Sequence, residues 1–174
     1  MKIIRFDELK AVPWKNGLGI TRELAVEPAG ASMDNFAWRV SIADVDTASP
    51  FSTFPGIDRT IVLLEGAGFT MLLDGEREHA LTTLLEPFAF PGEAKVDVRL
   101  AGGATRDFNL MVRRGVGAAK LEVLQGPGEF EAVKIAYIAR GSGHADGHPI
   151  GAGDSIVDPT RITLDNGTQA LAIL

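Results

Sequence analysis

The segment spanning residues 51–75 places strict limits on what this chain can fold into. It reads FSTFPGIDRTIVLLEGAGFTMLLDG, in which an apolar run is followed by Gly-Ala-Gly, a second apolar run and Asp74-Gly75. Short apolar runs bounded by glycine turns are typical of β-strands. Glycine permits the positive φ that tight hairpin turns require. The segment therefore predicts a β-hairpin in which a strand, a Gly-x-Gly turn and a second strand follow one another directly.

Similar runs recur along the whole chain, which predicts an all-β fold. The 20 glycines and 9 prolines fall mostly between them. Two helical turns are expected, near residues 6–10 and around residues 104–108. The expected strands cover residues 19–26, 36–43, 59–65, 69–73, 95–100, 107–112, 120–124, 133–139 and 169–173.

The layout of residues 51–75 resembles the metal-binding motif of cupins, a class of small β-barrels, without its histidines. That motif carries His-x-His ahead of the strand and the Gly-x-Gly turn, whereas this chain reads Gly56-Ile57-Asp58-Arg59 there. First-row transition metals favour imidazole nitrogen ligands. We therefore expect no metal and no other cofactor, and predict that Arg59 and polar neighbours hold a ligand instead.

A weak internal repeat indicates two such units. Residues 61–75 are echoed by residues 135–153, where a strand again leads into a Gly-x-Gly turn and a hairpin. Two tandem units predict a bicupin, that is, two fused antiparallel jelly-roll β-barrels with little helix. We expect a first lobe at about residues 1–115, including the N-terminal strands, and a second lobe at about 116–174. The alternative is one β-sandwich with a long insertion.

The composition argues against several classes of protein. The chain has no cysteine, which rules out disulfides, thiolate metal clusters and thiol catalysis. Its first ten residues lack the apolar core of a signal peptide, and no later apolar run approaches the roughly 18 residues that span a bilayer. A net charge of −6 without a basic stripe disfavours nucleic acid. We expect a cytoplasmic protein without a membrane or nucleic-acid partner.

Three blocks of the sequence resemble the signature blocks of the HutD/Ves family. They are VPWKNGLGITREL at residues 12–24, FAWRVSIADVDTASPFSTFPGIDRTIVLLEG at residues 36–66, and RDFNLMVRR at residues 106–114. The resemblance extends through nearly the whole chain. It implies a bacterial bicupin, commonly dimeric, associated with histidine-utilisation enzymes or with the stress-induced Ves branch. For the HutD branch it implies a regulator whose ligand is N-formylglutamate or a similar small carboxylate, without an established catalytic activity.

Polar residues recur at every second position in three of the expected strands. Alternate residues of a strand share one face, so each polar set lies opposite an apolar face. This pattern fits either a solvated outer face or a polar pocket inside a barrel. The sets are Thr21 and Glu23, then Arg39 and Ser41, then Asp107, Asn109 and Met111.

For the pocket we predict a set of residues suited to a small carboxylate. Arginine matters most because its planar guanidinium binds a carboxylate through two parallel hydrogen bonds. Glu23 and Asp107 hold the cations or accept amide protons from the ligand. The hypothesis fails if Arg39 and Arg59 lie on opposite outer surfaces with no cavity shared between them. The predicted ligand-binding set, which contains no catalytic or metal-binding residue, is Lys15, Asn16, Thr21, Glu23, Trp38, Arg39, Ser41, Arg59, Asp107, Asn109 and Met111.

For some aromatic and histidine residues, an ordinary structural role is the alternative to ligand or metal binding. Trp38 and Met111 also fit a core, whereas the loop of residues 14–17 fits a lid because Gly17 frees its backbone. The run His144-Ala-Asp-Gly-His148 resembles a metal cluster. Its Asp-Gly step instead predicts a hairpin tip, where side chains splay outward.

Three functions remain open from the sequence. The leading one is a metal-free small-carboxylate binding protein that regulates histidine utilisation. The others are a metal-independent cupin enzyme acting on a small polar metabolite and a Ves-type stress-related interaction protein. A homodimer is expected because exposed sheet edges are often covered by a second subunit, with the apolar Ile173-Leu174 terminus contributing to the contact.

Overall fold

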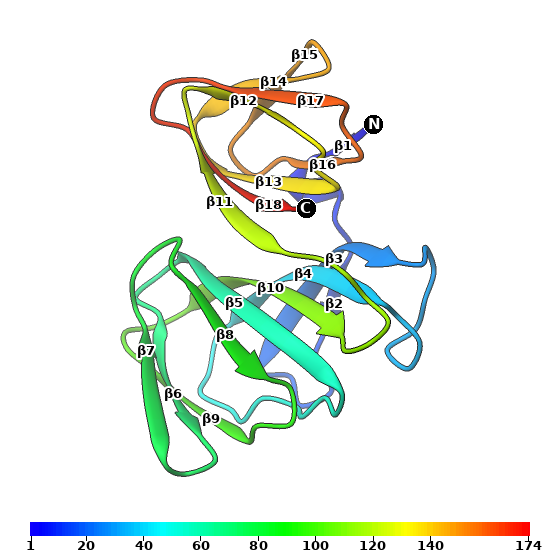
Figure 1. Ribbon diagram of the computed structural model, residues 1–174. Helices are drawn as coiled ribbons and strands as arrows, with labels where there is room; N and C mark the ends of the chain where they lie inside the picture. Colours follow the sequence, from blue (N-terminus) through cyan, green and yellow to red (C-terminus); the bar gives the residue numbers. More distant parts are fainter. The chain divides into compact units, whose positions relative to one another are not determined.

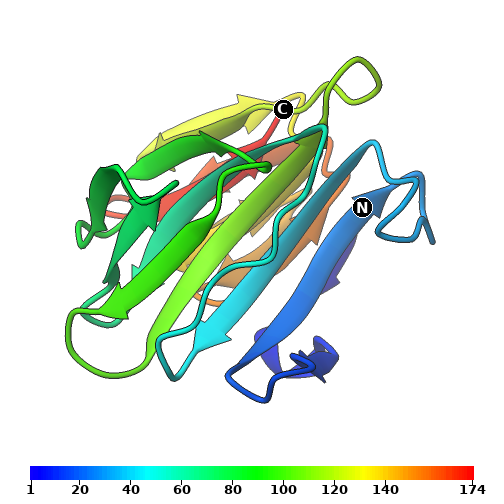
Figure 2. The ribbon, with the colours of Figure 1, turned by 90° about the horizontal axis from the view of Figure 1, so that it is seen from below.

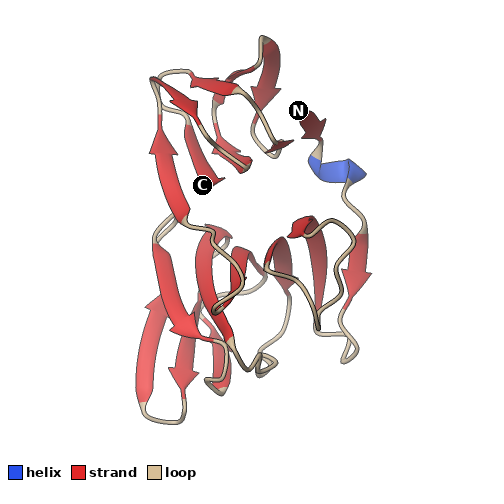
Figure 3. Cartoon of the chain, turned by 45° about the vertical axis from the view of Figure 1, so that its right-hand side comes forward, coloured by secondary structure: helices blue, strands red, loops and turns tan.

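The structure is a computed structural model that describes residues 1–174 and consists almost entirely of β-strands. Figure 3 shows the single helical element, the 3-10 turn η1 (Phe6–Glu8), in blue. The chain separates into a large unit, Ala11–Ala118, and a small unit, Met1–Lys10 with Ala119–Leu174. None of its helical segments has the length and apolar character needed to cross a membrane.

The large unit consists of a six-stranded and a three-stranded antiparallel sheet (Figure 1). The six-stranded sheet has the order β2-β3-β4-β10-β5-β8, and its long strands run side by side in Figure 2. The three-stranded sheet has the order β7-β6-β9. The strands are β2 (Ala11–Pro13), β3 (Gly19–Glu27), β4 (Trp38–Val45), β5 (Ile57–Glu65), β6 (Phe69–Leu73), β7 (Arg77–Leu81), β8 (Pro87–Pro91), β9 (Val96–Leu100) and β10 (Thr105–Arg113).

The apolar core of the large unit lies between these two sheets. Ile61 and Leu63 of β5 pack in one buried cluster with Phe69 and Met71 of β6. Because side chains alternate along a strand, Arg59 shares a face of β5 with Ile61 and Leu63. We call this face of the six-stranded sheet the interior face.

The small unit has a five-stranded sheet of order β1-β16-β13-β18-β11 and a four-stranded sheet of order β12-β17-β14-β15. The core of this unit is an apolar cluster that includes Leu124, Ile138, Ile156 and Ile162. The strands are β1 (Lys2–Ile4), β11 (Leu121–Gln125), β12 (Gly128–Glu131), β13 (Ile135–Arg140), β14 (Ser142–Ala145), β15 (His148–Gly151), β16 (Ser155–Val157), β17 (Arg161–Leu164) and β18 (Gln169–Ile173).

Every strand predicted from the sequence is present, within two residues at each end, and η1 confirms the first helical turn. The second predicted turn, at residues 104–108, is wrong. Those residues enter β10, which pairs with β4 on one side and with β5 on the other. Hydrogen bonding on both edges outweighs the turn propensity of the preceding Gly102-Gly103.

The N-terminal strands are divided between the units. β1 pairs with β16, with Ile3 opposite Ile156, so residues 1–10 belong to the small unit. The predicted first lobe of about residues 1–115 included all of these N-terminal strands, whereas the structure groups β1 with the small unit. β1 follows the chain start and completes one edge of the five-stranded sheet.

Gly68 makes the predicted Gly-x-Gly turn possible. Its φ is +79°, and a Cβ there would lie 1.9 Å from the carbonyl oxygen of Leu81. A residue with a side chain would face both a strained backbone and a backbone clash. The turn between β5 and β6 therefore needs glycine at this position.

Candidate functional site

Arg39 and Arg59 lie in one row across the interior face. The strand register places Arg39 opposite Met111 of β10, and Met111 opposite Arg59 of β5. Directly opposed residues of antiparallel strands project from the same face. The two arginines therefore do not lie on opposite surfaces of this sheet.

The next two rows carry the remaining interior polar groups. Ser41 and Asn109 are opposed in the second row, with Glu23 of β3 opposite Ser41. Asp107 lies in the third row, and Thr21 lies in the same row on β3. The structure thus brings most of the predicted set onto one face of β3, β4, β5 and β10.

Arg59, Asn109 and Asp107 form a buried line of hydrogen bonds, which we call the buried triad. Nη2 of Arg59 donates to Oδ1 of Asn109 at 3.0 Å, and Nδ2 of Asn109 donates to Oδ1 of Asp107. The three residues are only 6%, 5% and 1% exposed. Two buried atoms, Nε of Arg59 and Oδ2 of Asp107, have no hydrogen-bond partner. Such groups normally find a partner, so these two atoms indicate unused binding capacity.

Burial sets the charge properties of the triad. It raises the pKa of Asp107 to about 7, although the charge of Arg59 and the hydrogen bond from Asn109 act in the opposite direction. It lowers the pKa of Arg59 to about 10, with nearby Arg39 adding to the decrease and Asp107 opposing it. Arg59 therefore remains a cation at neutral pH, whereas Asp107 is poised between its two protonation states.

Three phenylalanine rings surround the guanidinium of Arg59. Its Cζ lies 5.5 Å from the ring centroid of Phe51, 5.3 Å from that of Phe54 and 4.9 Å from that of Phe90. Cation–π contacts at these distances stabilise a desolvated cation. The contacts of these rings with Arg59 were not predicted, although Phe51 and Phe54 lie in the same segment as Arg59, residues 51–75.

Arg39 is held differently, by an ion pair closer to solvent. Its Nε donates to Oε2 of Glu23 at 2.7 Å, and Nη1 donates to Ser41 Oγ at 3.4 Å. The side chains of Glu23 and Arg39 are 45% and 14% exposed. Polar side chains therefore become progressively more buried from Glu23 on β3, through Arg39 on β4, to Arg59 on β5.

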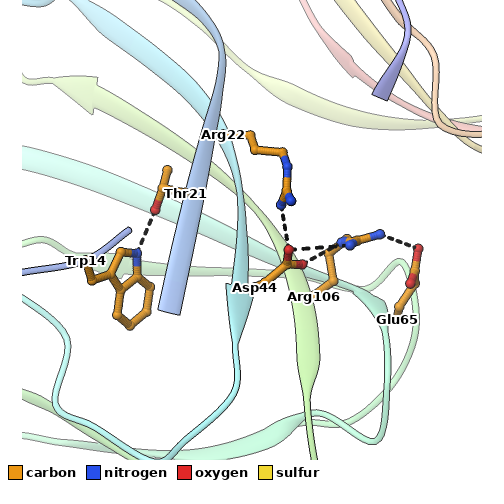
Figure 4. Close-up of polar contacts among 6 residues, drawn as sticks. All are labelled: Trp14, Thr21, Arg22, Asp44, Glu65 and Arg106. Carbon is orange, nitrogen blue, oxygen red and sulfur yellow. Dashed lines mark hydrogen bonds and ion pairs between the residues drawn. The ribbon is translucent and has the colours of Figure 1, made fainter. Parts of the chain in front are cut away.

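The predicted lid is the loop of residues 14–17, which begins at Trp14. Its Nε1 donates to Thr21 Oγ1 at 2.8 Å, as Figure 4 shows. Its ring covers Gly19 so closely that a Cβ on Gly19 would lie 2.8 Å from it. Lys15 and Asn16 are exposed in the turn that follows, where Asn16 Oδ1 accepts a hydrogen bond from the Leu18 backbone. The structure does not bring these two residues to the buried triad.

Trp38 and Met111 have packing roles. Trp38 neighbours Arg39 along β4, so it points to the opposite face, where it is buried. Met111 is on the interior face but packs in a buried cluster with Phe36 and Ile57. Of the two, only Met111 lies beside the arginines.

The opposite face of the same sheet carries a separate ionic network (Figure 4). Asp44 accepts from Arg22 at 2.5 Å and from Arg106 at 2.6 Å, and Arg106 also donates to Glu65 at 3.0 Å. Burial alone would raise the pKa of Asp44, but the hydrogen bonds from Arg106 and Arg22 lower it overall. The carboxylate of Asp44 is fully occupied by these partners.

The predicted histidine hairpin is confirmed in the small unit. β14 and β15 pair directly, with Asp146 and Gly147 at the tip and both His144 and His148 exposed. Asp146 accepts hydrogen bonds from the backbone of Thr160 and Arg161. Its carboxylate therefore fixes a turn.

The interior donors of the large unit do not fit a first-row transition metal. On the interior face of the six-stranded sheet they are guanidinium, amide and hydroxyl groups with the carboxyl groups of Asp107 and Glu23, and no imidazole lies on that face. Such metals favour imidazole and thiolate ligands. The donor set fits an anion instead.

Solved structures define the fold as a bicupin, two fused antiparallel jelly-roll barrels with little helix, as predicted. HutD from Pseudomonas fluorescens SBW25, in a formate condition, matches with a TM-score of 0.84 and 31% identity over 98% of this chain and 96% of that chain. Hazelnut vicilin (Corylus avellana) matches with a TM-score of 0.61 and 9% identity over 98% of this chain and 84% of that chain. The vicilin match concerns the fold alone.

Sequence comparison then identifies the family. The HutD family profile matches residues 7–163. An uncharacterized 21.2 kDa protein from the hutC 3′ region of Pseudomonas putida is 35% identical over 147 residues, which are 84% of this chain and 76% of that protein. Protein Ves of Escherichia fergusonii is 39% identical over 111 residues, 63% of this chain and 56% of that protein. The chain belongs to the HutD family, which confirms the resemblance seen in the sequence.

Proposed function

We propose that the large unit binds a small carboxylate at Arg59 without a metal, and that this binding regulates histidine utilisation. The buried triad is the observation that carries the proposal. A guanidinium buried with an unpartnered Nε is costly unless an anion or another acceptor completes its hydrogen bonds. Its aromatic surroundings cover the guanidinium with rings, which leaves its N–H edge as the part that a carboxylate recognises.

The relatives support the choice of ligand and role. One relative comes from the hutC 3′ region of Pseudomonas putida, and a HutD structure was obtained in a formate condition. The first supports a role in histidine utilisation, and the second supports a small carboxylate as the ligand. N-formylglutamate joins a formyl group to an amino-acid carboxylate and is therefore the first ligand to test.

A titration of the full chain tests this function. We expect N-formyl-L-glutamate or formate to raise the melting temperature saturably, because a ligand that binds only the native state stabilises it. Glutamate and urocanate serve as comparison compounds. Arg59→Ala is expected to weaken binding by roughly 2–5 kcal/mol, the usual effect of removing one partner from a buried charged pair.

The matched control is Asp58→Asn. Asp58 is the neighbour of Arg59 on β5, is exposed and pairs with Arg114 at 3.4 Å. Because it lies on the opposite face of the strand, its substitution should leave affinity unchanged. Equal affinity in wild type and Arg59→Ala would exclude Arg59 as the anchor.

One observation favours a second function, a metal-independent enzyme. Burial raises the pKa of Asp107 to about 7, the range in which a general acid or base works best. Incubating the full chain with the same compounds and following them by NMR tests this. Consumption of substrate that is lost in Asp107→Asn would favour catalysis over binding alone.

The predicted homodimer belongs to the same proposal, but the C-terminal residues expected to contribute to it already pack within one chain. Ile173 is fully buried within β18, and Leu174 packs against the core of the small unit. These side chains already contribute to the fold of one chain. Sedimentation of the purified protein at several concentrations tests for a dimer, and a single monomer mass throughout would contradict it.

A further inference from the structure

We propose that a carboxylate bound at Arg59 is accompanied by one proton, which Asp107 takes up. This inference rests on the proposed function and adds a regulatory property of the same site. It predicts that the protein binds its ligand more tightly at lower pH.

The geometry of the buried triad couples the two events. A single amide, that of Asn109, separates the guanidinium of Arg59 from the carboxyl group of Asp107. In the empty site Arg59 is the cation that offsets an ionised Asp107. Once a ligand carboxylate also lies against Arg59, one cation must offset two anions in a buried environment. Protonating Asp107 removes this excess negative charge.

The other charged groups on the interior face cannot replace Arg59 in this role. The charge of Arg39 on β4 is already matched by Glu23 on β3, at 2.7 Å. Asp44, on the opposite face of β4, acts on Asp107 in the direction of protonation. Arg59 is therefore the cation that offsets an ionised Asp107, and the hydrogen bond from Asn109 adds to its effect.

The three-stranded sheet places no buried cation in the shared core. Its buried residues in the shared core are apolar. Two titratable side chains of β7 share the inward face with Leu81: Arg77, which is exposed, and His79, which is partly buried and stacks on Phe88 with ring centroids 3.6 Å apart. Burial lowers the pKa of His79, with the charge of Glu86 acting against this effect and that of Arg77 adding to it. This lowered pKa favours the neutral form of His79.

Without a ligand, Asp107 titrates near neutral pH. Burial raises the pKa of Asp107 to about 7 before any ligand is present. A bound carboxylate raises it further, so proton uptake accompanies binding around neutral pH. The dissociation constant should then rise by up to about tenfold for each pH unit above the pKa of the empty site.

Isothermal titration calorimetry of the full chain tests the coupling. N-formyl-L-glutamate and formate are titrated in buffers of different ionisation enthalpy between about pH 5 and pH 8. We expect an uptake near zero at about pH 5 that rises toward about one proton at about pH 8. Binding with the same heat in all buffers at about pH 8 would overturn the inference and leave the proposed function intact. If neither compound binds at any pH, both proposals are overturned.

Two variants and one spectroscopic measurement identify the proton acceptor. Asp107→Asn, which resembles the protonated acid, should bind without proton uptake and with a dissociation constant independent of pH. Asp58→Asn is the control and should retain the uptake of the wild type. Carbon-13 NMR of the wild-type Asp107 carboxyl should show a midpoint that moves to higher pH when formate is saturating. An unmoved midpoint would overturn the inference even if Asp107→Asn fails to fold.

Discussion

The two units share part of their strand order and a turn but fill their interiors with different chemistry. The orders β10-β5-β8 and β7-β6-β9 of the large unit correspond to β18-β13-β16 and β15-β14-β17 of the small unit. In each, a strand leads through a glycine turn into a hairpin, β5 into β6 in the large unit and β13 into β14 in the small unit. Gly66 and Gly141, the first glycines of these turns, both have positive φ. Aligning them places Ala136 and Ile138 of β13 where β5 has Ile61 and Leu63, and all four are buried core residues.

The strand register then shows what replaces the buried triad. In the large unit Ile61 and Leu63 lie opposite Asn109 and Asp107, whereas in the small unit Ala136 and Ile138 lie opposite Ala172 and Ala170. The counterpart of Arg59, seven residues before the turn glycine, is the exposed Lys134. A cupin barrel of this chain therefore folds with an apolar interior. The fold does not demand the buried triad, which supports a functional reason for it.

The largest expected effect is the loss of stability from core substitutions, which should affect ligand binding in the large unit only. Ile156→Ala in the small unit should lower the free energy of unfolding by about 2–5 kcal/mol, because it leaves a cavity in an apolar core. Ile61→Ala in the large unit should have a similar effect on stability. Only Ile61→Ala should also weaken ligand binding, since Ile61 lies opposite Asn109. Urea denaturation followed by circular dichroism, together with ligand titration, measures both quantities. Equal effects of the two variants on affinity would contradict a site confined to the large unit.

The next effect concerns pH. Folding raises the pKa of Asp107 from 3.8 to about 7. The unfolded chain therefore loses this proton first, and the wild type should lose stability as pH rises from about 4 to about 7. The difference between the two pKa values corresponds to at most about 4 kcal/mol. Asp107→Asn should remove this loss, so its stability relative to wild type increases with pH over that interval.

A buried aspartate of the small unit provides the control for this measurement. Asp154 is paired with Arg5 and accepts a hydrogen bond from the Gly151 backbone. Asp154→Asn weakens satisfied interactions and should lower the free energy of unfolding at neutral pH by about 1–3 kcal/mol. At about pH 8, Asp107→Asn is thus expected to raise the free energy of unfolding, whereas Asp154→Asn is expected to lower it. A loss of stability in Asp107→Asn at that pH would mean that the Asp107 carboxylate is ionised there and has a full set of hydrogen-bond partners.

Removing the central amide should have a smaller effect. Asn109→Ala introduces the residue that the small unit has at the equivalent position, Ala172. In the large unit it leaves Nη2 of Arg59 and Oδ1 of Asp107 without their partner. We expect a loss of about 1–3 kcal/mol in the free energy of unfolding, measured by urea denaturation. A saturating carboxylate ligand should recover part of it. No loss in the absence of ligand would show that water or side-chain rearrangement satisfies both groups.

The difference between the units also explains which features the sequence could predict. Alternating patterns and glycine turns identified the strands, because burial on one face of a sheet leaves a period of two in the residues. The same period placed Arg39 with Ser41 on one face of their strand, and Asp107 with Asn109 on one face of theirs. It could not show that Asn109 bridges Arg59 and Asp107, or that Phe90 reaches Arg59 from β8. Those contacts depend on side-chain lengths and on pairing between distant strands.

The smallest effect is expected for the ion pair of Glu23 with Arg39, the part of the polar set that lies closest to solvent. Glu23 is 45% exposed, so its ion pair with Arg39 should contribute less than about 1 kcal/mol to stability. Glu23→Gln should therefore leave the urea midpoint nearly unchanged, with any difference disappearing at high salt. It also frees the charge of Arg39 beside Arg59, so carboxylate affinity should increase modestly. A decrease in affinity would indicate that Glu23 contacts the ligand itself, which would extend the site from the buried triad to the exposed β3 strand.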